Sequence, residues 1–264
     1  MNKMKDRNSI QFQDLKLMEE KEIRISQNDN VLRCTQSGKI NDRKHGYLIS
    51  KESTSNEAFV FLSDFDVVIQ AADAFIDLRQ KRYTDLVFDG GLSFLSNMEE
   101  TKNSINFYYT IGCIEIKKSI LLLGDGSLNF EIEYLQGPEA NFSISPFLAF
   151  RNIYSLNQNN HTEFSSMIGN YRIVIKSSAS DADLHLECNK KFKYTELNQW
   201  YNNITYHSTK HLNDQYENLF VPGSFDFKIE AGENIIFNAS LNSGDGITEF
   251  KLHKHYQNHE MALV

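Results

Sequence analysis

The stretch ENLFVPGSFDFKIEAGENIIF, residues 217–237, decides the fold. Its apolar residues at 225, 227 and 229 alternate with polar ones, which is the period of a strand with one buried face. A turn at 231–233 and a return strand beginning at Ile235 would complete a β-hairpin. Pro222-Gly223 predicts a type II turn before the hairpin, because Pro fixes φ near about −65° and Gly accepts positive φ.

Short alternations of the same kind recur along most of the chain. They predict further strands at residues 23–25, 59–62, 67–69, 74–78, 105–111, 114–123, 128–134, 142–153, 171–175, 184–188 and 247–256. Turn signals such as the Gly-Asp-Gly runs at 124–126 and 244–246 separate these segments, and no segment shows three turns of helical periodicity. We therefore expect an all-β protein built as a large antiparallel β-sandwich of two stacked sheets.

Length and charge set the number of domains and exclude several partners. The 264 residues suit a single sandwich, which we place at 21–256, after a charged lead-in at 1–20 and before a tail at 257–264. The net charge of −8 argues against a nucleic-acid partner, since phosphate backbones select basic surfaces. The apolar runs are all shorter than the roughly 18 residues of a membrane-spanning helix, so we expect no membrane partner.

Cysteine usage and the first residues bear on the cellular compartment. Cys34, Cys113 and Cys188 are odd in number, far apart and without CxxC spacing. This pattern indicates a reducing compartment and argues against a disulfide scaffold or a zinc site. The polar first residues show no signal peptide. We therefore expect a cytoplasmic protein that needs neither a metal nor another cofactor.

Four stretches, in order along the chain, carry a family resemblance. They are HGYLI at 45–49, LSDFD at 62–66, SPFLAFRNI at 145–153, and WY at 200–201 followed by YENLFVPGSF at 216–225. Together they resemble the N-terminal β-domain of bacterial and archaeal-type glycogen debranching enzymes, the amylo-α-1,6-glucosidases. The apolar framework is kept, whereas some polar positions differ from the family pattern, as at Asn218, where the family carries Asp.

The resemblance implies both a fold and a role. It implies a galactose-mutarotase-like supersandwich, and it places the hydrolytic carboxylates in a separate C-terminal (α/α)-barrel domain. The chain would then be a non-catalytic N-terminal domain that supports this helical-barrel glucosidase domain, in cis or in trans, and contacts an α-glucan such as glycogen or a maltooligosaccharide. Two alternatives stay open: a free-standing α-glucan-binding module, and an enzyme in its own right with a converging His/Glu pair, which no sequence spacing supports.

Candidate substrate-binding or domain-interface residues lie on both sides of the polar segment after the only tryptophan. Trp200 and Tyr201 could stack on the C–H faces of sugar rings, or they could pack in the core. Glu217 and Asn218 could bond sugar hydroxyls or touch a partner domain, or they could stabilise the turn before Pro222. None of these residues is expected to be catalytic.

Arg151 and His45 are further candidates for substrate binding or for a domain interface, although a structural role is favoured for each. Arg151 follows an apolar strand and is expected to form an ion pair, and His45 is expected to be a satisfied histidine at a strand start. Asp64 and Asp66 would face one side of an edge strand. Paired acids can serve glycoside hydrolysis, but this spacing offers no visible cleft. The three histidines at 253–259 lack a nearby carboxylate or cysteine at ligand spacing, so no metal site is expected.

Overall fold

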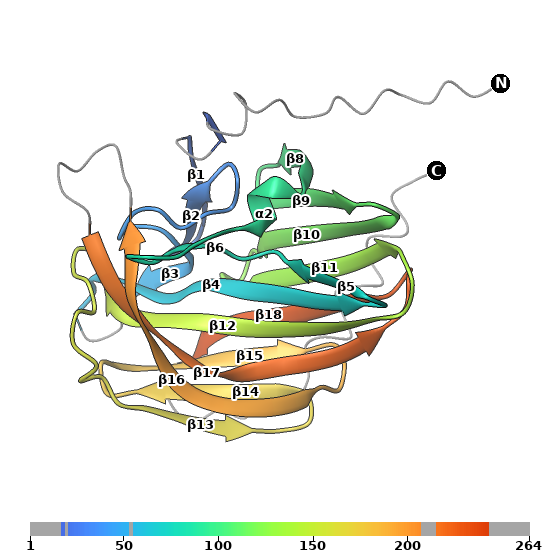
Figure 1. The fold of residues 1–264 in the computed structure, drawn as a ribbon. Helices are drawn as coiled ribbons and strands as arrows, with labels where there is room; N and C mark the ends of the chain where they lie inside the picture. Colours follow the sequence, from blue (N-terminus) through green and yellow to red (C-terminus); the bar gives the residue numbers. More distant parts are fainter. Residues whose placement is uncertain (1–16, 19–20, 53–54, 207–214, 243–264) are drawn as a thin grey trace.

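The computed structural model describes residues 17–18, 21–52, 55–206 and 215–242. Two antiparallel sheets of eight strands each form the layers of a sandwich (Figure 1). The prediction of a large antiparallel β-sandwich is confirmed. The chain outside these ranges includes the expected tail at 257–264, the expected strand at 247–256 and most of the lead-in, so those predictions lie outside the described residues.

Seven strands run side by side in the first sheet. Their spatial order is β1 (Glu22–Gln27), β2 (Asn30–Thr35), β3 (Gly46–Lys51), β4 (Ala58–Ala71), β12 (Ala140–Asn152), β17 (Gln215–Ile229) and β16 (Lys193–Tyr206). The eighth strand, β5 (Ala74–Asp77), folds back and pairs with the end of β4. The strands β4, β12 and β17 are therefore the central strands of this sheet, and their side chains decide what its two faces carry.

The second sheet forms the other layer. Its spatial order is β13 (Phe164–Ile168), β14 (Arg172–Ser177), β15 (Ser180–Cys188), β18 (Asn234–Asn242), β11 (Leu128–Gln136), β10 (Ile114–Leu122), β9 (Ser104–Ile111) and β8 (Leu95–Glu100). A small hairpin of β6 (Gln80–Arg82) and β7 (Val87–Asp89) precedes the single turn of helix α2 (Gly90–Ser93). An isolated bridge from Tyr83 to Ile204 ties this hairpin to β16.

The core lies between the two sheets and is built by the two-residue period of the strands. In β11 the apolar side chains at alternate positions are buried, and the polar ones between them are half-buried. Phe65 of β4 stacks on Phe130 of β11 at a ring distance of 4.3 Å and on Phe237 of β18 at 5.7 Å. Such interdigitating rings hold two stacked sheets together, because they remove large apolar areas from water.

The hairpin predicted for residues 225–237 is wrong in its pairing. The turn at 231–232 is present, but β17 belongs to the first sheet and β18 to the second, so the turn is an arch between layers. Strand β18 pairs with β11 and β15 instead. Alternation shows which face of a strand is buried, and an arch satisfies that pattern as well as a hairpin does.

The type II turn predicted at Pro222-Gly223 is also wrong, since both residues lie inside β17. Neither β12 nor β16 has a residue in register with Pro222, because both ladders shift register there. Proline lacks an N–H and is tolerated at such an irregularity. Gly223 is needed for space, since a Cβ atom would collide with the ring of Tyr194. Within the described residues, no helix is long and apolar enough to cross a membrane.

Candidate functional site

A buried ion pair joins three neighbouring strands of the first sheet. Arg151 lies in β12, Glu217 in β17 and Tyr206 at the end of β16. The guanidinium of Arg151 donates to both carboxylate oxygens of Glu217, with Nη2–Oε2 at 2.8 Å, and the hydroxyl of Tyr206 donates to Oε2 at 2.5 Å. Glu217 is 0% exposed and Arg151 is 4% exposed. The expected ion pair of Arg151 is thus present, and its partner is another of the predicted site residues.

The protonation of this group is fixed by burial and by the charge of Glu217. Burial lowers the pKa of Arg151, but the charge and hydrogen bonds of Glu217 outweigh that effect and leave the pKa raised. Burial, and then the Glu217 carboxylate, raise the pKa of Tyr206 well above its ordinary value. Arg151 therefore stays a cation and Tyr206 a neutral donor at neutral pH. Both oxygens of Glu217 are occupied, so this carboxylate serves as a junction between strands.

Asn218 anchors the loop that follows β12. Its N–H donates to the carbonyl of Asn157 at 2.7 Å, and its side-chain amide donates to the carbonyl of Gln158 at 3.2 Å and to Oδ1 of Asn160 at 2.9 Å. Its Oδ1 accepts the N–H of Asn203 at 3.0 Å. The Glu-Asn pair of the sequence motif therefore connects β17 to β12, to β16 and to the loop, through two buried side chains.

Lys81 of β6 is another buried cation, and the sequence did not point to it. Its Nζ binds Oδ2 of Asp64 at 2.8 Å and Oδ1 of Asp66, and it lies 3.7 Å from the ring centre of Phe147. The side chain of Lys81 is 4% exposed, and each aspartate side chain is 11% exposed. A single lysine in a polar stretch carries no local signal, because its partners lie more than ten positions away in sequence.

The two aspartates lie in β4, a central strand, so their predicted place on an edge is wrong. Phe65 points toward the second sheet, and by alternation Asp64 and Asp66 point the other way, toward the hairpin of β6 and β7. Burial raises the pKa of Asp66 to about 6, although Lys81 opposes the rise and Asp64 adds to it. Burial lowers the pKa of Lys81, but the two carboxylates more than reverse this and leave it raised.

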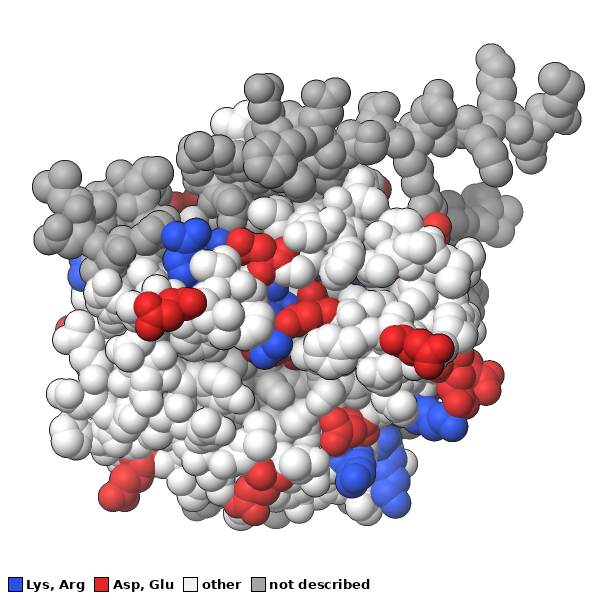
Figure 2. All heavy atoms as spheres, in the orientation of Figure 1, with Lys and Arg blue, Asp and Glu red and all other residues white. Residues whose placement is uncertain are grey.

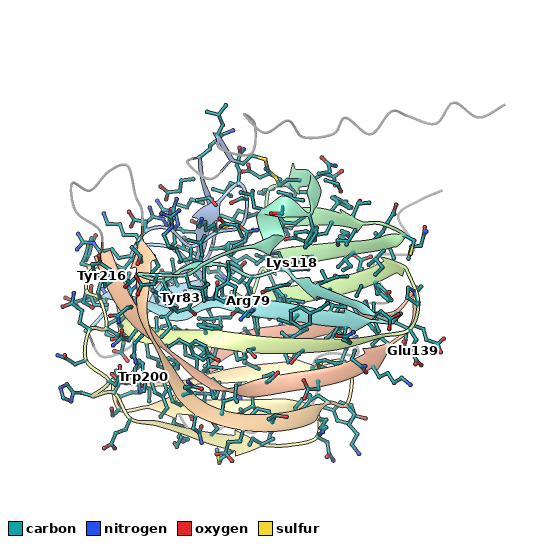
Figure 3. All side chains as sticks on the ribbon, in the orientation of Figure 1. Arg79, Tyr83, Lys118, Glu139, Trp200 and Tyr216 are labelled. Carbon is teal, nitrogen blue, oxygen red and sulfur yellow. The ribbon has the colours of Figure 1, made fainter. Side chains whose placement is uncertain are left out.

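Trp200 packs against aromatic rings from both sheets. Its ring centre lies 5.6 Å from that of Phe164 in β13 and 5.6 Å from that of Phe220 in β17, and these two phenylalanines stack at 4.3 Å. Figure 3 shows Trp200 near β13, where the two edge strands approach each other. Tyr201 points to the other side of β16 and packs on Phe147 at 5.1 Å. Both side chains are half-buried. Their ring contacts correspond to the second of the two roles considered for them, which is packing against other aromatic residues.

His45 precedes β3, as expected, and is 4% exposed. Its Nδ1 accepts the N–H of Asn41 at 3.4 Å, and its own N–H donates to the carbonyl of Asp42 at 2.9 Å. These contacts close the turn before the strand. Within the described part of the chain, no three His, Cys, Asp or Glu side chains gather as metal ligands would.

A groove of about 510 Å³ crosses the first sheet on the face that Figure 2 shows. Strands β4, β5, β12, β16 and β17 all contribute to it, and acidic and basic side chains gather toward its lower right in the figure. Its lining residues are Val68, Gln70, Phe75, Asn141, Phe142, Ser143, Lys193, Asp226, Phe227 and Lys228. No predicted site residue lines it. The available signal for this groove was Phe75, an aromatic residue on the exposed face of a short strand.

The comparison with protein families identifies the chain. The family model for the N-terminal region of glycogen debranching enzyme matches residues 33–236, which is most of the chain and runs from β2 to β18. The chain therefore belongs to the glycogen debranching enzyme N-terminal family, as the resemblance of its motifs indicates. The comparison with curated proteins gives no match.

Several solved structures share parts of the architecture at low identity. A bacterial glucoamylase complexed with acarbose has 11% identity and a TM-score of 0.47, with 90% of this chain and 33% of that chain covered. A GalM/aldose epimerase homologue from C. elegans has 6% identity and a TM-score of 0.49, with 85% and 99% covered. The heparan sulfate lyase HepC mutant from Pedobacter heparinus has 11% identity and a TM-score of 0.36, with 64% and 22% covered. The chain thus spans less than two thirds of the lyase and of the glucoamylase, and the family assignment rests on the family model alone.

Proposed function

We propose that the chain is a non-catalytic β-domain that supports a helical-barrel glucosidase domain, in cis or in trans, and contacts α-glucan. The observation that carries this proposal is the family match over residues 33–236. The buried acids support the non-catalytic part of this proposal, because each is held in an ion pair. Asp64 and Asp66 both pair with Lys81, and Glu217 pairs with Arg151. Glycoside hydrolysis needs one carboxyl group that can give up a proton and a second that can attack or activate water.

The open edges of the sandwich support docking of a second domain. Strand β13 ends the second sheet and β16 ends the first, and the contact between Phe164 and Trp200 brings these edges together. Met167 is 59% exposed and Ile168 is 48% exposed on β13, and Leu197 is 39% exposed on β16. Exposed apolar side chains on an uncovered edge strand favour contact with another protein surface.

The proposal is tested by purifying the tagged chain from its own cells and measuring glucose release from an α-1,6-branched dextrin. We expect the glucosidase activity to co-purify with the chain, or to reside in the same polypeptide. The variant Met167→Lys should lower the recovered activity several-fold, because it places a charge in the proposed interface. Leu135→Lys, at a 42% exposed position on β11, is the matched control. A purified chain that carries no associated glucosidase activity would contradict the proposal.

A free-standing α-glucan-binding module is the second candidate, and the groove across the first sheet supports it. Such a module would bind glycogen alone, without a helical domain. For either function we propose a cytoplasmic setting, which the free thiols of Cys34, Cys113 and Cys188 support. Retardation of the purified chain in a native gel that contains glycogen, relative to a gel without it, measures binding by the chain alone.

A further inference from the structure

The groove across the first sheet is built from two cross-strand rows of side chains. One row runs through Phe75, Gln70, Asn141 and Lys228, which stand in register on β5, β4, β12 and β17. The rows cross the strands, so their length follows from the strand spacing of about 4.8 Å, and β5 to β16 spans roughly 19 Å. The groove is therefore longer than one sugar ring and suits a short linear ligand.

The second row brings a fixed carboxylate to the floor of the groove. Val68, Ser143, Asp226 and Lys193 stand in register on β4, β12, β17 and β16. Oδ1 of Asp226 accepts the hydroxyls of Ser143 at 2.8 Å and of Ser224 at 3.4 Å. Oδ2 accepts the hydroxyl of Thr195 at 3.2 Å. These donors hold the carboxylate plane in place, occupy both lone pairs of Oδ1 and leave one on Oδ2. A carboxylate oriented in this way can accept a ligand hydroxyl group at Oδ2.

The other polar groups of the groove favour a neutral, hydroxyl-rich ligand. The side-chain amide of Asn141 makes no hydrogen bond to another described residue, and Gln70 uses only its amide N–H, which donates to the carbonyl of Ala72 at 2.8 Å. Lys228 is paired with Glu139 at 2.7 Å. The remaining charged residues that line the groove are Asp226 and Lys193, whose charges are opposite. A groove without a dominant charge gives no advantage to an anion or a cation.

An exposed aromatic ring forms the apolar wall. Phe75 is 65% exposed, and it stands on β5 at the end of the first row, beside the polar side chain of Gln70. Aromatic rings beside hydrogen-bonding groups match pyranoses, which carry apolar C–H faces and equatorial hydroxyls on one ring. The volume of about 510 Å³ lies within the roughly 300–1,000 Å³ of small-ligand sites.

We propose that this groove is the α-glucan contact of the domain and binds a linear maltooligosaccharide, with Phe75 under one sugar ring and Asp226 accepting one of its hydroxyls. The inference rests on the proposed function, because it places the glucan contact that the function includes. It moves that contact away from Trp200, which lies seven positions along β16 from Lys193, roughly 23 Å at about 3.3 Å per residue.

The test is calorimetric titration of the full chain with maltohexaose. We expect Phe75→Ala and Asp226→Asn each to raise Kd about tenfold, the scale of one ring contact or one charged hydrogen bond. Tyr154→Ala is the matched control, because Tyr154 is 66% exposed and lies on the loop after β12. This variant and Trp200→Phe should bind as the wild type does, and the fluorescence of Trp200 should not change on binding.

Three results would overturn the groove assignment. Wild-type binding that Phe75→Ala and Asp226→Asn leave unchanged would place the glucan elsewhere and leave the proposed function standing. No binding by the wild type would remove the glucan contact, while support of a glucosidase domain is still judged by the co-purifying activity. Self-association that Phe75→Ala abolishes would assign the groove to a second copy of the chain. Circular dichroism of each variant establishes that the fold is kept.

Discussion

Lys81→Met would remove the cation that both Asp64 and Asp66 bind and that lies over the ring of Phe147, while keeping an unbranched side chain of nearly the same length. Removing one partner of a buried ion pair costs about 3–5 kcal/mol, because the remaining charge is left desolvated. A domain of this kind has a free energy of unfolding of about 5–15 kcal/mol. We therefore expect this single change to remove a large fraction of the stability at neutral pH.

The pH dependence of stability follows from the direction in which the pKa of Asp66 is shifted. Burial already raises the pKa of Asp66 to about 6 with Lys81 in place, and loss of Lys81 raises it further. A carboxyl group with a raised folded pKa binds more protons folded than unfolded, so stability falls as pH rises from about 4 through that pKa. The stability that Lys81→Met removes is therefore lost in full only above the folded pKa of Asp66, and the loss becomes smaller at acid pH.

Guanidinium unfolding at about pH 7.5 and about pH 5, followed by the fluorescence of Trp200, measures this effect. We expect a loss of about 4 kcal/mol at the higher pH and a clearly smaller loss at the lower. The control Lys176→Met breaks a pair with Asp183 in which the lysine is 54% exposed, and should cost under about 1 kcal/mol. Equal losses for Lys81→Met at both pH values would refute the reasoning.

Further predictions concern other buried groups. Arg151→Met should destabilise the domain by about 3–5 kcal/mol in the same unfolding assay, and replacing Glu217 with Gln as well should recover part of the loss. Asn218→Ala should cost about 1–3 kcal/mol and speed limited proteolysis in the loop after β12, since both side-chain hydrogen bonds from Asn218 to that loop are lost. Burial raises the pKa of the Cys34 thiol to about 12, so peptide mapping after alkylation at about pH 8 should find the exposed Cys113 modified and Cys34 modified only after unfolding.

The layers of the fold were predictable because alternation is a local property. The buried faces of β11 and β15 follow from one residue in two being apolar, and the sandwich follows from many such strands. Pairing was not predictable in the same way, since the arch at 231–232 and a hairpin leave the same pattern. The turn predicted at Pro222-Gly223 was wrong for a related reason. A register shift inside a strand tolerates Pro and Gly, which are also the residues that a type II turn favours.

The candidate site was predictable where the partners lie close to a recognisable motif. Arg151 and Glu217 both belong to family-like stretches, and their strands are neighbours, so the expected ion pair formed between two candidates. Lys81 and the groove residues belong to no motif, and they come together only through the order of strands in the sheet. The position of Asp64 on a central strand depended on the same long-range order.

The place of β18 in the second sheet has a consequence for the order in which the protein forms. This strand comes last among the described strands, yet it lies between β15 and β11 and joins the two halves of its sheet. During synthesis those halves remain separate until residues 234–242 leave the ribosome. The pairing of β11 with β18 closes a loop of about a hundred residues, and such distant contacts make folding slow. Until that strand arrives, the inner edges of both half-sheets are unpaired, and the nascent domain is open to other chains.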